Sequence, residues 1–144
     1  GVAEIHLVLT ELGEKSYAQS DFFRKREFRQ HLIEGAEQAC CPLLPRVSTH
    51  WSLARCLESL RAEEEGGSRI LFHPYGDPPR LLALPGLRPP FLLAVGSERG
   101  WTETELELFR GDGFVTAGLG ERILKTETAA ITAATLALAY LGLL

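Results

Sequence analysis

Three loops of the sequence combine glycine with polar side chains, and each directly follows an apolar segment. They are residues 73–76 (HPYG), 96–100 (GSERG) and 118–128 (GLGERILKTET). The loops that follow parallel strands meet at one edge of the sheet, where open sheets bind their ligands. Glycine permits tight turns and a close approach of the backbone to a bound molecule. The spacing therefore predicts one ligand site built from three loops.

The commonest site motifs are missing from these loops. Neither G-x-x-x-x-G-K-[ST] nor G-x-G-x-x-G occurs, which disfavours ATP in a P-loop and NAD in a Rossmann turn, and there is no G-x-S-x-G elbow. The cysteines form no C-x-x-C pair and their number is odd, so we expect reduced thiols, no metal and a cytoplasmic protein. The histidines lack metal-ligand spacing; they are His6, His31, His50 and His73.

Composition limits the choice of partner. The chain has 144 residues, 45% of them hydrophobic, and a net charge of -4, which suits one globular domain. This charge argues against binding nucleic acid by electrostatics alone. The best basic patch, Arg24 to Arg26 with Arg29, is equally typical of a solvated helix face. The apolar tail at 129–144 is shorter than the roughly 20 residues of a membrane span, so we expect no membrane and a helix packed on a sheet or a second subunit.

Apolar runs alternating with amphipathic segments predict the elements that would hold the loops. We expect strands at 2–9, 69–73, 91–95 and 114–117, a short extended piece near Val47, and helices at 21–40, from Ser52, from Thr102 and from Thr128. The run FLLAV at 91–95 is wholly apolar and is expected at the centre of the sheet. Thr102 and Glu105 have the spacing of a capping box. The order predicts an α/β fold, a mostly parallel sheet flanked by helices.

The loops also carry a family resemblance. Residues 92–133, LLAVGSERGWTETELELFRGDGFVTAGLGERILKTETAAITA, resemble the signature of the ribosomal RNA uridine-N3 methyltransferases (small subunit methyltransferase E family). That family carries IGPEGG, an acidic helix, GF and then LG-x-RILR-x-ETA. EIHLVLTELGEKSYAQS and LIEGAEQA upstream are similar too, so the resemblance spans nearly the whole chain. One G-x-E-x-G would be weak evidence, whereas two loops in order at the right separation are specific.

The resemblance implies a SPOUT-class fold with a deep carboxyl-terminal trefoil knot, and a homodimer that binds S-adenosylmethionine. The implied activity is methylation of N3 of a uridine in small-subunit (16S) ribosomal RNA. Carried over by position, the cofactor-binding residues would be His73, Gly96, Glu98, Gly100, Leu119, Gly120, Arg122, Ile123 and Leu124. No catalytic base is assigned. The acidic candidates are Glu98 and Glu127, and the cationic ones are Arg122 and Lys125.

Several residues depart from the family pattern. Ser97 stands where the family has a proline, and Arg99 stands where it has its second glycine. Lys125 takes the place of the family's closing arginine. Glu37 and Gln38 are followed by Ala39, where the family usually has an arginine. We expect residues 1–144 to be one methyltransferase domain that lacks the family's first strand and helix and its amino-terminal RNA-binding barrel. Two alternatives remain open: a catalytically weak or inactive knotted dimer that binds RNA or a ribosomal partner, and a knotted methyltransferase acting on another RNA position.

Overall fold

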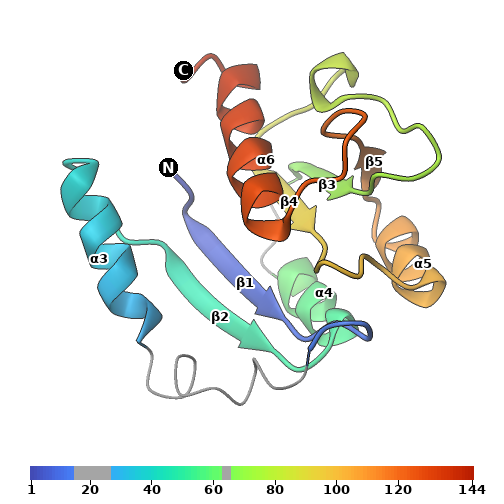
Figure 1. Cartoon of the computed structure of the whole chain (residues 1–144), viewed down its shortest axis with the longest axis horizontal. Helices are drawn as coiled ribbons and strands as arrows, with labels where there is room; N and C mark the ends of the chain where they lie inside the picture. Colours follow the sequence, from blue (N-terminus) through green and yellow to red (C-terminus); the bar gives the residue numbers. More distant parts are fainter. Residues whose placement is uncertain (15–26, 63–65) are drawn as a thin grey trace.

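All strands in a computed structural model of the chain, which describes residues 1–14, 27–62 and 66–144, are parallel and form two sheets (Figure 1). In one sheet β1 (Glu4–Val8) pairs with β2 (Arg46–His50). In the other, β3 (Ser68–Phe72) lies between β4 (Phe91–Val95) and β5 (Val115–Ala117). The predicted parallel strands are confirmed. The predicted central place of 91–95 is wrong, because β4 is an edge strand and β3 holds the centre.

Side chains of β3 alternate between two hydrophobic clusters, one on each face of the sheet. Leu71 packs with residues of α4 (Leu53–Ala62) and α5 (Glu103–Gly111). Ile70 and Phe72 pack on the other face with α6 (Thr126–Tyr140) and with Leu81 of the 3-10 helix η1 (Leu81–Ala83). Alternation sends successive side chains of a strand to opposite faces. Helices therefore cover both faces of this sheet, as the sequence predicts.

The helices match their predicted positions, with shifted ends. The first is α3 (Phe28–Gln38), which has no fully buried residue, and positions 21–26 of the predicted helix lie outside the described residues. The last helix, α6, begins at Thr126, two residues before the predicted start. It buries alanines 129, 133 and 137 against the sheet. Among the described helices, none is both long and apolar enough to cross a membrane.

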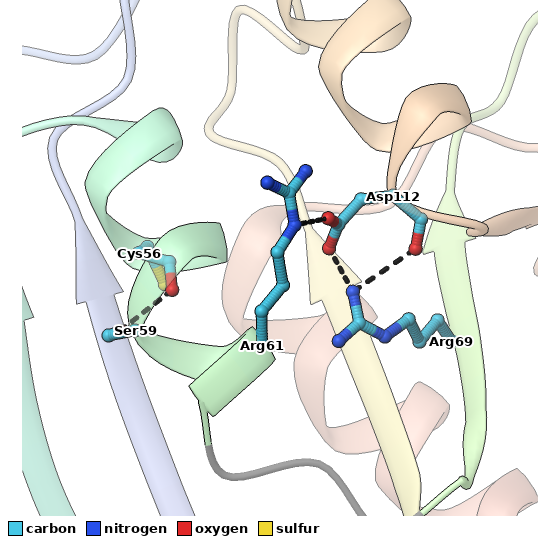
Figure 2. Close-up of polar contacts among 5 residues, drawn as sticks. All are labelled: Cys56, Ser59, Arg61, Arg69 and Asp112. Atoms are coloured by element: carbon cyan, nitrogen blue, oxygen red, sulfur yellow. Dashed lines mark hydrogen bonds and ion pairs between the residues drawn. The ribbon is translucent and has the colours of Figure 1, made fainter.

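A buried carboxylate ties α4, β3 and α5 together (Figure 2). The side chain of Asp112, just after α5, is 2% exposed and accepts hydrogen bonds from Arg69 of β3 and Arg61 of α4. Arg69 Nη1 also donates to the Asp112 carbonyl oxygen at 3.1 Å, and its guanidinium lies 5.6 Å from the ring centroid of Phe114. A charge this deep is tolerated only when it is paired and hydrogen-bonded.

Glu105 helps to cap the amino terminus of α5 and also holds the loop that follows β1. The predicted capping box is present: Thr102 Oγ1 accepts from Glu105 N at 3.2 Å, and Glu105 Oε2 accepts from Thr102 N at 3.0 Å. The second carboxylate oxygen, Oε1, accepts from the backbone N–H of Glu11 at 2.9 Å. Glu105 is 2% exposed, so its charge is satisfied by backbone donors on two segments.

Candidate functional site

The three predicted loops meet at the carboxyl ends of β3, β4 and β5, around a cavity of about 100 Å³. Loops after neighbouring parallel strands are expected to converge in this way. All nine residues singled out from the sequence line the cavity; they are His73, Gly96, Glu98, Gly100, Leu119, Gly120, Arg122, Ile123 and Leu124. The sequence therefore predicted which residues lie together. Nine further residues line the cavity. Five of them belong to the three predicted loops, Pro74, Tyr75, Ser97, Arg99 and Thr126, and the four that the sequence missed are Phe72, Val95, Trp101 and Ala129.

Hydrogen bonds between loops hold this arrangement. Thr126 Oγ1 donates to the Gly96 carbonyl oxygen at 3.0 Å and so joins the start of α6 to the loop after β4. Gly118 N donates to the Pro79 carbonyl oxygen at 2.9 Å, and Gly118 pairs with Arg80 in an isolated parallel bridge. The loop after β5 is thereby fixed beside the connector between β3 and β4.

Two glycines at the cavity have a steric reason to be glycine. A Cβ on Gly96 would lie 3.1 Å from Trp101 Nε1, and that indole donates to the Phe72 carbonyl oxygen at 3.3 Å. Gly100 has a φ of +73°, a left-handed conformation that side chains rarely adopt. Its N–H donates to the Ser97 carbonyl oxygen at 2.9 Å and closes the turn. The loop GSERG is thus tight because of its two terminal glycines.

Two buried polar atoms beside the cavity have no hydrogen-bond partner within the described part of the chain. They are His73 Nδ1 and Ser97 Oγ, and both residues line the cavity. Burial lowers the pKa of His73 below its usual 6.5; to a smaller extent the Glu103 carboxylate raises this pKa and the Arg110 guanidinium lowers it. The imidazole is therefore neutral at pH 7 and offers a donor or an acceptor at Nδ1. Unpaired buried polar groups are costly, and a bound ligand could satisfy both.

Charged side chains stand at the solvent side of the cavity. Glu98, Arg99 and Arg122 line it and are exposed. Ile123 is 68% exposed. The other two charged candidates, Glu127 and Lys125, are exposed and are not among the lining residues. In the predicted basic patch, Arg29 is exposed on α3, and the other three positions lie outside the described residues.

A second group of polar side chains gathers between β1, β2 and α4. His6 Nδ1 and His50 Nε2 are 3.1 Å apart, and His6 Nε2 is 3.3 Å from Glu4 Oε2. Cys56 Sγ lies within 4.8 Å of both imidazoles. Sequence spacing could not show this group, because the histidines are 44 residues apart. Burial raises the pKa of Cys56 to about 11, so without a metal ion its sulfur is a neutral thiol at pH 7.

Comparison with known proteins identifies relatives over nearly the whole chain. A family model described as an RNA methyltransferase domain matches residues 1–138. The Ribosomal RNA small subunit methyltransferase E of Treponema pallidum is 38% identical over 141 residues, which are 96% of this chain and 53% of that protein. A Legionella pneumophila methyltransferase solved with bound SAM is 28% identical at a TM-score of 0.78.

A Ribosomal RNA small subunit methyltransferase E from Neisseria gonorrhoeae, bound to S-adenosyl methionine, is 27% identical at a TM-score of 0.77. Both structures cover 96% of this chain, which spans 56% of each of them. The chain thus spans about half the length of the relatives it matches. The mixed α/β fold with parallel sheets flanked by helices is shared with them.

Proposed function

The chain belongs to the RNA methyltransferase domain family, and on that premise we propose that it transfers a methyl group from S-adenosylmethionine to small-subunit ribosomal RNA. One observation carries the proposal: the nine residues carried over from the family resemblance surround one cavity at the carboxyl ends of the strands. The names and bound cofactor of the relatives support the same activity. It is a proposal for this chain because only about half of each relative is matched.

The residues around the cavity fit this cofactor chemically. His73 Nδ1 and Ser97 Oγ are buried polar atoms without partners, suited to the ribose or amino-acid groups. Three apolar side chains can pack against the adenine, those of Leu119, Ile123 and Leu124. Pockets for small molecules usually enclose roughly 300–1,000 Å³, more than the present cavity of about 100 Å³. We expect the exposed Ile123 to move outward when the cofactor binds.

Within this proposal the target atom is N3 of a uridine. The bound cofactor supplies an electrophilic methyl group, and the protein has to bring N3 to about 3–3.5 Å from it. The N3 proton must also leave, which requires a base or stabilisation of the anion that forms. Glu98 lines the cavity, whereas Glu127 does not, so Glu98 is the better placed carboxylate. Arg122 lines it too and can stabilise negative charge.

The proposal includes a carboxyl-terminal trefoil knot and a homodimer. The pairing of Gly118 with Arg80 and the packing of α6 on β4 and η1 support a knot, since they bring the last segment against the connector of β3 and β4. For the dimer, the face of α6 away from the sheet carries Ile131, which is 69% exposed, and the apolar Leu143 and Leu144 follow. Light scattering at micromolar concentration tests the dimer, and a stable monomer would contradict it.

The proposal also covers the rest of the protein. Residues 1–144 form one methyltransferase domain, and a first strand, a first helix and an RNA-binding barrel would precede Gly1, as the family resemblance implies. A net charge of -4 gives this domain little electrostatic hold on RNA, so the barrel and the dimer would supply it. Activity on ribosomal RNA would place the protein in the cytoplasm.

The decisive experiment is to map modified nucleosides in RNA from cells with and without the gene. We expect one N3-methyluridine in small-subunit RNA to disappear on deletion and to return with the parental gene. Gly96→Ala should not restore it, because the added Cβ crowds Trp101. The matched control, Gly111→Ala, should restore it, since its Cβ meets nothing within 4 Å. Loss of a different RNA modification would correct the target, and no lost modification would refute the activity.

A further inference from the structure

The polar group between β1, β2 and α4 brings together three side chains of the types that bind metal ions. His6 comes from β1, His50 from the end of β2 and Cys56 from α4. One ring nitrogen of each histidine and the sulfur of the cysteine all lie within 4.8 Å of one another. Imidazole and thiolate are typical ligands of zinc. None of the three residues lines the cavity between the loops after β3, β4 and β5, so the group is separate from the proposed cofactor site.

Strand pairing turns both histidines toward α4. In the parallel register His50 of β2 is paired with Val8 of β1, two residues beyond His6. Val8 packs against the hydrophobic cluster that contains Leu53 of α4. Residues two apart on a strand, and residues paired across neighbouring strands, point to the same face of a sheet. The two imidazoles therefore lie on the face covered by α4, where Cys56 is 3% exposed.

The spacing of the two imidazoles is close to that of two ligands of one metal ion. His6 Nδ1 and His50 Nε2 are 3.1 Å apart, whereas the ring centroids are 5.3 Å apart, so the two nitrogens converge. With Zn–N bonds of about 2.0–2.1 Å, two nitrogens on a tetrahedral zinc ion lie about 3.3 Å apart. With a Zn–S bond of about 2.3 Å, a sulfur ligand lies about 3.6 Å from each nitrogen. An approach of the Cys56 sulfur by about 1 Å at most would complete this geometry.

Glu4 holds His6 in the orientation that metal binding needs. His6 Nε2 lies 3.3 Å from Glu4 Oε2, and the other carboxylate oxygen of Glu4 pairs with Arg46 of β2. The hydrogen bond from Arg46 lowers the pKa of Glu4, so Glu4 is ionised at pH 7. A carboxylate that accepts from Nε2–H leaves the lone pair of Nδ1 for a metal, and metal-binding histidines usually have such a partner. Burial, and to a smaller extent His6, lower the pKa of His50, so this imidazole is neutral at pH 7, the form that binds metals.

We infer that His6, His50 and Cys56 bind one zinc ion, with water as the fourth ligand. The ion replaces the hydrogen bond between the imidazoles: the proton on His50 Nε2 moves to Nδ1, and the thiol proton of Cys56 passes to water. All three side chains also line a cavity of about 590 Å³, which gives the ion and its water a path to the site. This inference replaces the expectation, drawn from sequence spacing, that the chain binds no metal. It does not depend on methyl transfer.

A hydrogen bond between the imidazoles accounts for the two histidines but not for the sulfur beside them. The bond drawn at Cys56 in Figure 2 runs from Ser59 Oγ to the Cys56 carbonyl oxygen at 2.8 Å, so the sulfur takes no part in it. Burial raises the pKa of the thiol to about 11, and coordination to a metal ion removes the proton of a thiol outright. A zinc ion therefore gives the buried sulfur a role that packing does not.

The test is a titration of the metal-free, tag-free 144-residue chain with cobalt(II), a spectroscopic substitute for zinc. We expect one equivalent to bind at micromolar concentration. The bound ion should give a thiolate-to-cobalt charge-transfer band together with the strong visible bands of a four-coordinate ion, and added zinc should abolish both. No charge-transfer band at millimolar cobalt would overturn the inference.

Variants show which side chains hold the ion. Cys56→Ser should abolish the charge-transfer band, and His6→Gln should weaken cobalt binding at least tenfold. Replacing the exposed Cys40 and Cys41 together by serine should leave the band unchanged. A band that survives Cys56→Ser, or that is lost with the two exposed cysteines, would overturn the inference. If Cys56→Ser does not fold, His6→Gln decides, since the His6 side chain is 16% exposed, and parental affinity in that variant would overturn the inference.

The positioning role of Glu4 has its own test. Glu4→Gln should weaken zinc binding about tenfold and leave the positions of the cobalt bands unchanged, because the three ligands remain. The matched control is Glu34→Gln, which removes a carboxylate 3.4 Å from the exposed His31 on α3 and should keep the parental affinity. Equal zinc affinity in the two variants would overturn the role given to Glu4.

Discussion

Thr126 Oγ1 donates a 3.0 Å hydrogen bond to the carbonyl oxygen of Gly96, thirty residues earlier in the chain. The bond joins the first turn of α6 to the loop after β4. Both residues line the loop cavity. The geometry of the candidate cofactor site therefore depends on a contact between two segments that are far apart in sequence.

Replacing Thr126 by valine should weaken cofactor binding about fivefold, because a net hydrogen bond contributes about 1 kcal/mol. Thr126→Ser keeps the hydroxyl and should retain the parental affinity. Calorimetry with S-adenosylhomocysteine measures both variants, and circular dichroism checks that both are folded. Parental affinity in the valine variant would show that this bond does not shape the site.

Arg99 should discriminate against the charged form of the cofactor. It lines the cavity, is exposed, and stands where the family has a glycine. S-adenosylmethionine carries a sulfonium charge that its demethylated product lacks, and the positive charge of Arg99 repels it. At a solvent-exposed site, Arg99→Gln should therefore raise the affinity for S-adenosylmethionine relative to that for the product by about 1 kcal/mol, or about fivefold. The affinity ratio of the two molecules is the readout. Arg88→Gln, an exposed arginine outside the cavity, is the control. An unchanged ratio would place Arg99 outside the site.

Asp112→Ala should destabilise the fold by about 3 kcal/mol, because it removes the carboxylate that neutralises the buried Arg69. Glu103→Ala breaks a surface ion pair between Glu103 and Arg110, whose side chains are 70% and 60% exposed, respectively. Such pairs contribute at most about 1 kcal/mol. Urea unfolding of the two variants compares a buried with an exposed carboxylate. Equal losses would contradict the structural role given to Asp112.

Part of the stability should be lost in mild acid through His73. Its pKa is lowered by burial in the folded protein, so the unfolded chain binds the proton more readily. This contribution is fully present above the unfolded pKa of about 6.5 and is lost as the pH falls toward the folded value. His73→Gln should therefore lose less stability between about pH 7.5 and pH 5. His31→Gln, whose histidine side chain is 69% exposed, should behave like the parent.

The sequence predicted those features that depend on local pattern. FLLAV forms a strand with the predicted bounds, and the capping box of Thr102 and Glu105 is present. The loops converge because the carboxyl ends of neighbouring parallel strands lie at the same edge of the sheet. The edge position of β4, the long-range bond of Glu105 to Glu11 and the pairing of Arg69 with Asp112 depend on which elements become neighbours. Periodicity along one segment carries no information about that choice.

The most direct test of the proposed cofactor site is a titration of the isotope-labelled chain with S-adenosylhomocysteine, followed by nuclear magnetic resonance. Binding at micromolar concentration, with the largest shifts at the backbone amides of Gly96, Gly100, Leu119 and Gly120, is the predicted result. No binding at millimolar concentration, or shifts that spare these loops, would contradict the proposal that this cavity holds the cofactor.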